Sequence, residues 1–264
     1  MTVVLNVNSH RPAATTKARP SRLGPPYLEV ALIILCLSLL AFGVWGPSIE
    51  QPDHYHAFAD QRQFFGVPNF VDVLSNLTFA GFGVVGLWRI WQMKQGMPNS
   101  AQQNLAGLFF FGMVVTALFS GWYHLQPNDS GLAIDRYGMT IAFAALLGLA
   151  ASTRASDRAG HCLTLAVLGF GAWSIWTWSA VGNVLPWAVL QFGGMVMMLG
   201  LGCMPARTDA LPVSWITVIL VYALAKVLEH ADEQMYHLSH ELVSGHALKH
   251  IVASCAALPV LAAI

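Results

Sequence analysis

Charged side chains are scarce in this chain of 264 residues: Asp, Glu, Lys and Arg together make up only 10% of it. A soluble globular protein usually carries about 25% charged residues, so this chain has too little polar surface to cover a domain in water. The 13 basic residues are balanced by 13 acidic ones, whereas a nucleic-acid-binding protein would show a basic excess. Hydrophobic residues make up 56% of the chain, which excludes a disordered protein and indicates an integral membrane protein.

Cysteine is also rare, and its positions follow no metal-binding or redox spacing. All four cysteines lie in or beside apolar stretches, and no two are spaced as Cys-x-x-Cys: Cys36, Cys162, Cys203 and Cys255. We therefore expect them to be small hydrophobic core residues rather than disulfides or metal ligands.

Long apolar stretches dominate the sequence and predict membrane-spanning helices. A spanning helix needs about 20 mostly apolar residues, since each residue adds about 1.5 Å across a hydrocarbon core about 30 Å thick. Apolar runs of this length are helices, because backbone polar groups in lipid must be satisfied internally. Eight stretches qualify: 27–45, 70–92, 104–124, 132–152, 160–180, 184–204, 213–229 and 245–263. The expected fold class is therefore an all-α integral membrane protein.

The first 26 residues contain four basic residues and several prolines and glycines, and we expect this segment to be disordered. A basic segment before an apolar run can be a secretory signal. However, the run 27–45 is longer than the 7–15 residues of a signal-peptide core, so we interpret it as an uncleaved first helix.

Basic residues indicate the orientation, because membrane proteins carry an excess of Lys and Arg on the cytoplasmic side. With the N-terminus inside, the inner side receives Arg11, Lys17, Arg19, Arg22, Arg89, Lys94, Arg154, Arg158 and Arg207. The outer side receives only Arg62, Arg136, Lys226 and Lys249. We therefore expect both termini to be cytoplasmic and the segments 46–69 and 230–244 to lie outside.

Polar residues that would lie inside the spanning helices are concentrated at three places. Ser120 and His124 lie one turn apart at the end of the third stretch, and His246 and His250 lie one turn apart at the start of the last. Asp135 lies near the start of the fourth stretch, next to Arg136. The predicted topology brings all three places to one depth near the outer surface. Ionisable residues inside a membrane are costly, so each is a functional hypothesis.

The histidine spacing suggests a metal site. Residues at i and i+4 share a helix face, so His246 and His250 can present two imidazoles to one point, and His124 can add a third. Three histidines with an open fourth position are typical of a catalytic zinc site. A hydrogen-bonded pair between helices is the plainer interpretation of the His-x-x-x-His pattern. Haem fits less well, because two ligands one turn apart on one helix cannot occupy opposite faces of the iron.

These residues resemble the CREST superfamily of membrane hydrolases, which includes the alkaline ceramidases and the progestin and adiponectin receptors. The resemblance rests on Ser-x-x-x-His, an Asp eleven residues later and His-x-x-x-His, here Ser120, His124, Asp135, His246 and His250. The sequence is most similar to alkaline ceramidases and their bacterial relatives, with further support from the Ser75-Asn76 pair. The resemblance covers about residues 65–264.

The resemblance implies how the chain is organised. It predicts a seven-helix membrane domain at 46–264 and makes the helix at 27–45 an extra transmembrane helix, which follows the disordered basic N-terminus at 1–26. A bacterial inner membrane is the expected location, with the active site near its outer face.

The resemblance also implies the roles of the site residues. His124, His246 and His250 would bind zinc, and an activated water would attack an amide carbonyl. Asp135 would move the proton from the water to the leaving amine, and Ser120 would donate a hydrogen bond to the developing oxyanion. The alternatives are a packing hydroxyl for Ser120 and an ion pair with Arg136 for Asp135.

One departure from the family argues against the calcium site of animal alkaline ceramidases. Asp53, Asp60 and Asp72 lie in the corresponding region, but Asn69 stands where the family has a glutamate. The remaining polar residues are expected to form a network behind the zinc site: Asp72, Ser75, Asn76, Glu229 and Asp232.

The function expected from these features is zinc-dependent hydrolysis of a ceramide-like lipid amide that enters from the bilayer. No nucleic acid or protein partner is indicated. A receptor or sensor with a structural zinc site is the first alternative, although such a site needs neither Ser120 nor Asp135. A transporter is more distant, because no internal repeat is found.

Overall fold

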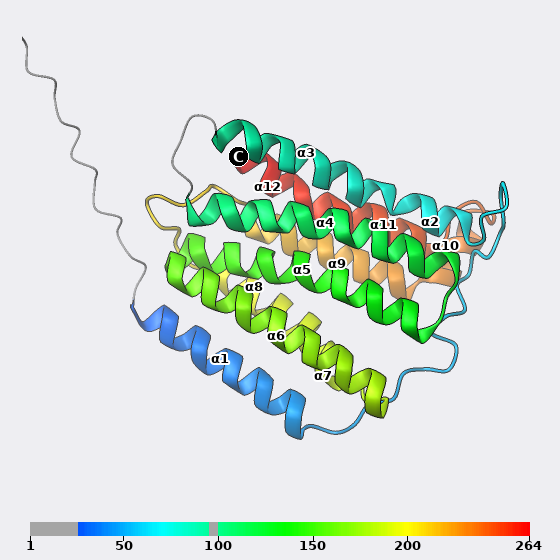
Figure 1. Cartoon of the computed structure of the whole chain (residues 1–264), viewed down its shortest axis with the longest axis horizontal. Coiled ribbons are helices and arrows are strands. Elements are labelled where there is room, and N and C mark those ends of the chain that lie inside the picture. The colour runs from blue at the N-terminus through cyan, green and yellow to red at the C-terminus, as the bar shows by residue number, and fades with distance from the viewer. Residues whose placement is uncertain (1–25, 95–99) are drawn as a thin grey trace, which may run out of the picture.

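The computed structural model describes residues 26–94 and 100–264, so the N-terminal segment expected to be disordered lies almost wholly outside the described residues. The described chain is a bundle of helices (Figure 1), and within it only two isolated β-bridges occur. The first half contains α1 Pro26–Trp45, α2 Phe70–Ser75, α3 Leu77–Lys94, α4 Ala101–Leu125, α5 Asp129–Arg154 and α6 Asp157–Val181. The second half contains α7 Leu185–Ala188, η1 Val189–Gly193, α8 Gly194–Gly202, α9 Trp215–His230, α10 Asp232–Leu238, α11 Gly245–Ser254, η2 Cys255–Ala257 and α12 Leu258–Ala263.

The prediction of an all-α membrane protein is confirmed. In the described part of the chain, 7 helical segments are long and apolar enough to cross a membrane. The stretch expected at 213–229 corresponds to α9, whose 16 residues make it shorter than these seven. The fifth and sixth expected stretches are separate helices, because Gly182 ends α6 in the left-handed conformation with φ 74°. Glycine adopts this conformation without steric cost.

Three of the spans are interrupted rather than uniform. Phe70–Met93 consists of α2 and α3, which are separated at Asn76. Leu185–Gly202 passes through the π-helical turn η1, and Gly245–Ala263 passes through the 3-10 turn η2. A π-helical turn inside a helix is rare and frequently lies at a functional site.

The first helix is peripheral to the rest of the bundle. Figure 1 shows α1, in blue, at one edge of the molecule, and it packs against α7 and η1. Only 17% of the residues in its most apolar stretch are buried inside the bundle, compared with 61% in the corresponding stretch of α5. The Ser156 hydroxyl hydrogen-bonds to Glu29 and joins this helix to the start of α6. This arrangement agrees with a seven-helix core and one added N-terminal helix.

Glycines let α4 and α5 pack closely, and this close packing determines which residues of the two helices face each other. A Cβ atom added at Gly112 would lie 2.5 Å from the backbone nitrogen of Ala142. The helices are also close at Thr116, one turn further along α4: a Cβ atom added at Gly138 of α5 would lie 3.1 Å from the Cα of Thr116. Small residues allow such close approach of spanning helices. Because the two helices are antiparallel, the next turn of this register brings Ser120 opposite the part of α5 that carries Asp135.

Candidate metal centre

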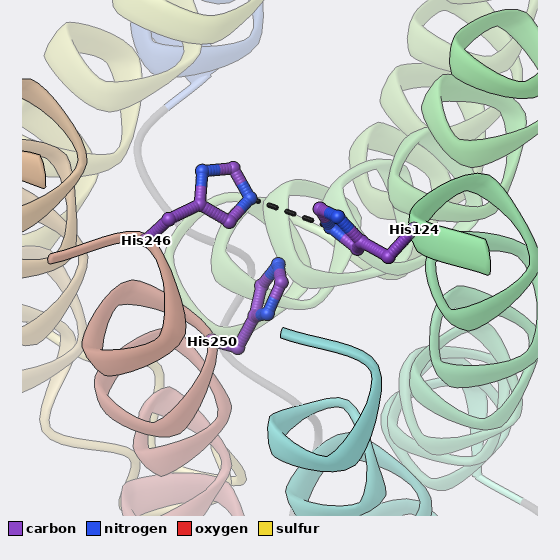
Figure 2. A group of neighbouring side chains, drawn as sticks. All are labelled: His124, His246 and His250. Carbon is purple, nitrogen blue, oxygen red and sulfur yellow. Dashed lines mark hydrogen bonds between the residues drawn. The ribbon is translucent and has the colours of Figure 1, made fainter. Parts of the chain in front are cut away.

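Three histidines from two helices converge near one end of the bundle. His124 lies in the last turn of α4, and His246 and His250 lie in the first turns of α11. One ring nitrogen from each lies within 4.8 Å of the others, and the Nε2 atoms of His124 and His246 are 3.3 Å apart. Figure 2 shows the three rings facing a common point. His124 and His250 are buried, and the cluster can hold a metal ion.

The orientation of the His250 ring is set by Ser75 of α2. The Ser75 hydroxyl donates to the backbone oxygen of Asp72 over 2.8 Å, and it also lies 2.8 Å from Nδ1 of His250. A carbonyl oxygen can only accept, so the hydroxyl proton is used there and the Ser75 oxygen accepts from Nδ1–H of His250. The Nε2 lone pair of His250 is then free for a metal ion, which is how outer hydrogen bonds usually fix a ligand histidine.

The end of α4 that carries His124 is held by Asn69. The Asn69 amide donates to the backbone oxygen of His124 over 2.9 Å. Asn69 precedes α2 in the left-handed conformation, with φ 46°, which asparagine tolerates better than most residues. Asn69 therefore links α2 to α4 beside the histidine cluster.

Two acidic residues position the start of α11. Ser244 caps this helix by accepting from the backbone nitrogen of Ala247, and its hydroxyl donates to Asp72 over 3.2 Å. Asp232 accepts from the backbone nitrogen of His246 over 2.7 Å. The first backbone N–H groups of a helix lack partners within it, so carboxylates and capping hydroxyls at this end are stabilising.

A cavity beside His250 brings together the other two residues expected in the site. Ser120 of α4 and Asp135 of α5 line it with His250. Both Ser120 and Asp135 are buried, and Oδ1 of Asp135 has no hydrogen-bond partner among the described residues. Within the same described residues, no salt bridge joins Asp135 to Arg136. The ion-pair alternative for Asp135 therefore receives no support from the geometry.

Glu229 takes part in a half-buried ion network rather than contacting the histidines. It accepts from Lys226 over 2.7 Å and from Lys249 over 3.2 Å. Lys249 also lies 3.0 Å from Nε2 of His246, so it connects this network to the histidine cluster. Asn76, the last of the five expected network residues, donates to the backbone oxygen of Asp72 and is not part of this ion network.

The carboxylates considered for calcium have separate surroundings. Asp53 is exposed in the segment 46–69, and Asp60 is paired with Arg62. Asp72 is buried against Ser244, and its second oxygen has no partner among the described residues. Across residues 26–94 and 100–264, only the three histidines form a metal-sized group.

Phe58 covers the histidine cluster from the segment between α1 and α2. Its ring centroid lies 4.7 Å from that of His124 and 4.6 Å from that of His246, and the side chain is only 6% exposed. The neighbouring Ala59 nitrogen donates to Asp232 over 3.0 Å. The aromatic ring therefore lies between the histidines and the solvent at this end of the bundle.

Arg62 holds the covering segment against the loop that follows α10. Arg62 donates to both carboxylate oxygens of Asp60, over 2.8 and 2.7 Å, and to the backbone oxygen of Leu242 over 2.9 Å. The hydrogen bond from Arg62 to Asp60 raises the pKa of the guanidinium above its ordinary value. Such two-pronged pairing is among the stronger protein hydrogen bonds.

Sequence reasoning missed three residues that contact the site or its cavity: Phe58, Lys226 and Lys249. The two lysines had a usable signal, because an ionisable residue within an apolar helix is costly in lipid. In the sequence they count only among the basic residues of the outer side. Phe58 had no such signal, since it lies in a segment whose apolar residues follow neither a helical nor a strand spacing.

The arrangement places three histidines that can hold a metal ion next to a cavity lined by a carboxyl group and a hydroxyl group. Comparison with protein-family models, with curated proteins and with solved structures gave no match to any of them. The function is therefore argued from the geometry of the site.

Proposed function

We propose that this protein is a zinc-dependent membrane amidohydrolase that cleaves a ceramide-like N-acyl lipid into a fatty acid and an amine lipid. The observation that carries the proposal is the cavity in which Ser120 and Asp135 meet His250, beside the three-histidine cluster. The motif similarity to the CREST superfamily supports the same assignment. A metal site with a purely structural role would need neither a buried carboxyl group nor a buried hydroxyl group at its edge.

The ligand chemistry supports zinc. Imidazole nitrogens bind zinc at about 2.0–2.1 Å in tetrahedral geometry, which corresponds to about 3.3 Å between two ligand nitrogens. The Nε2 atoms of His124 and His246 are 3.3 Å apart. Three protein ligands leave a fourth position open, which is typical of catalytic rather than structural zinc.

The reaction adds water across the amide: a bond forms between the water oxygen and the acyl carbon, and the carbon–nitrogen bond breaks. Bound zinc would lower the pKa of water towards about 7 and so supply a nucleophile at neutral pH. Asp135, with an unpartnered oxygen, is suited to accept the proton of the attacking water and return it to the leaving amine. The Ser120 hydroxyl is suited to donate to the carbonyl oxygen as negative charge develops there.

An apolar cavity supports a lipid substrate. It has a volume of about 110 Å³ and is lined mainly by apolar side chains, among them Phe109, Met113 and Leu146. Its walls are shared with the catalytic cavity at Phe79, Thr116, Met139, Tyr222 and Ala253. An acyl chain in the apolar cavity would therefore lead its amide carbonyl towards Ser120, Asp135 and His250.

The proposed setting is a bacterial inner membrane with both termini in the cytoplasm and the site near the outer face. The excess of basic residues on the expected inner side supports this orientation. Phe58 closes the solvent end of the histidine cluster, which favours lateral entry of the lipid from the bilayer.

Metal analysis of the detergent-purified protein, combined with a fatty-acid release assay on a short-chain ceramide, tests the proposal. We expect about one zinc ion per chain, and we expect His124→Ala to lose both zinc and release. His237→Ala is the matched control, because His237 is exposed on α10. Zinc without release from any N-acyl lipid would favour the receptor alternative, and absence of zinc would contradict the proposal.

A further inference from the structure

A second, strongly polar cavity lies next to the catalytic one and contains an arginine with unused hydrogen-bond donors. It extends from His246 and Asp135 to Arg136, with Lys226, Lys249 and Glu229 in its walls. Arg136 is only 1% exposed. Its Nη2 donates to Gln51 over 3.0 Å, but Nε and Nη1 find no acceptor among the described residues.

Aromatic rings, rather than carboxylates, hold the Arg136 side chain in place. Its guanidinium carbon lies 4.1 Å from the ring centroid of Trp178 and 5.3 Å from that of Trp187. Cation–π contacts of this kind stabilise a cation and leave its N–H groups free. A buried cation without a hydrogen-bonded counter-charge is costly. The two unused N–H groups of Arg136 therefore lack an anionic partner among the described residues.

The charges around this cavity also favour an anion. Three cations line it, namely Arg136, Lys226 and Lys249, against two carboxylates, Asp135 and Glu229. Glu229 is engaged by both lysines, and Asp135 lies beside the catalytic cavity without pairing with Arg136. The nearby Asp232 carboxylate is bound to backbone N–H groups of Ala59 and His246. One positive charge therefore remains without a partner in the cavity wall.

We propose that this cavity binds an anionic head group, a carboxylate or a phosphate, on the amine side of the lipid amide. The inference rests on the proposed hydrolase function, because it names the class of that enzyme's substrate. The planar guanidinium of Arg136 matches the two oxygens of a carboxylate or phosphate. With the acyl chain in the apolar cavity and the amide beside His250, the head group would extend past His246 to Arg136. The preferred substrate is then an acidic N-acyl lipid rather than a neutral ceramide.

A binding experiment tests this inference without requiring hydrolysis. The probes are dodecyl phosphate and dodecanol, which have the same alkyl chain and no amide, titrated into protein in a non-ionic detergent. We expect dodecyl phosphate to bind about tenfold more tightly, as a charge-assisted hydrogen bond allows. Arg136→Gln should bring the two affinities close together, whereas the exposed Arg158→Gln at the other end of the bundle should keep the difference. Each probe also partitions into the detergent micelles. Because this partition is the same for every variant, it cancels when the ratio of the two affinities is compared between variants.

Lys226→Gln provides a second variant, in case Arg136→Gln fails to fold after losing its aromatic contacts. It removes a cation from the same wall, so the preference for dodecyl phosphate should fall about threefold or more. Equal affinities of the unaltered protein for both probes would overturn the inference. A preference that survives both substitutions would overturn it as well.

A hydrolysis experiment separates this inference from the proposed function and distinguishes the two anions. N-lauroylglycine, O-phospho-N-lauroylethanolamine and N-lauroylethanolamine share one acyl chain and differ in head-group charge. A kcat/KM at least about tenfold higher for one of the anionic amides supports the inference and identifies the anion. Equal hydrolysis of all three would leave the amidohydrolase standing and overturn the head-group inference. Binding preference without hydrolysis would support the anion site and contradict the enzyme.

Discussion

The Ser75 oxygen lies 2.8 Å from Nδ1 of His250 and, in the same geometry, donates its proton to the backbone oxygen of Asp72. A hydroxyl on α2 thus determines which nitrogen of a histidine on α11 is free to bind a metal ion. Hydrogen bonds of this kind from outside the ligand set commonly change metal affinity by about 10–100-fold.

Ser75→Ala is therefore expected to weaken metal binding by about 10–100-fold while leaving the three histidines in place. Competition with a chromophoric zinc chelator measures the change. Ser254→Ala is the matched control, because Ser254 is also buried but its hydroxyl donates only to the backbone oxygen of Ile251. Equal affinity in Ser75→Ala and the unaltered protein would show that Ser75 does not orient His250.

Asp135→Asn is expected to retain the metal ion and to lower turnover by about 10²–10⁴-fold, because the amide cannot accept the proton of the attacking water. Metal content and fatty-acid release are measured on the same preparation. Asp129→Asn is the control on the same helix, since the Asp129 side chain is 74% exposed. Full turnover in Asp135→Asn would assign the proton transfer to another residue.

Phe58→Ala removes the ring that covers His124 and His246 at the solvent end of the bundle. We expect the metal ion to be lost to EDTA about tenfold faster, because the apolar surroundings of a metal site limit solvent access. Stopped-flow chelation measures this rate. Phe65→Ala controls for a change in the same segment, since Phe65 is 97% exposed. If both variants release metal at the rate of the unaltered protein, Phe58 is not a barrier to solvent.

Sequence patterns predicted the histidine cluster because helix spacing and the order of the spans are enough to bring its three residues together. The i, i+4 spacing fixes His246 and His250 on one face of a helix, and the alternating direction of the spans brings His124 to the same depth. Ser75 came from family similarity alone, since no periodicity distinguishes it from other serines in apolar helices.

The rest of the site depends on tertiary packing that no local pattern records. Phe58 reaches the histidines only because Ala59 and Arg62 attach its segment to Asp232 and Leu242. Lys226 and Lys249 look like residues that extend to the membrane surface, as lysines near helix ends usually do. Their shared contact with Glu229 keeps them inside the bundle instead.

Gly112→Ala tests whether close packing of α4 against α5 sets the position of Ser120 and Asp135. The added methyl group would lie 2.5 Å from the backbone nitrogen of Ala142, so the two helices must separate. We expect a loss of about 1–3 kcal/mol in the free energy of unfolding, the usual cost of overpacking. Unfolding in mixed micelles measures it. Gly121→Ala on the same helix meets nothing within 4 Å and should be neutral or stabilising. A Gly112→Ala protein as stable as Gly121→Ala would contradict the packing argument.

Ala253→Leu tests whether the apolar cavity receives the acyl chain. Ala253 lines both this cavity and the cavity beside His250, so a larger side chain there narrows the passage between them. We expect kcat/KM for a C16 amide to fall about tenfold relative to a C6 amide, because pocket shape discriminates chains by about 1–3 kcal/mol per methylene misfit. Ala262→Leu adds the same volume at an exposed position of α12 and should leave the ratio unchanged. A uniform loss of activity on both chain lengths in Ala253→Leu would instead indicate a distorted site, and an unchanged ratio with full activity would place the acyl chain elsewhere.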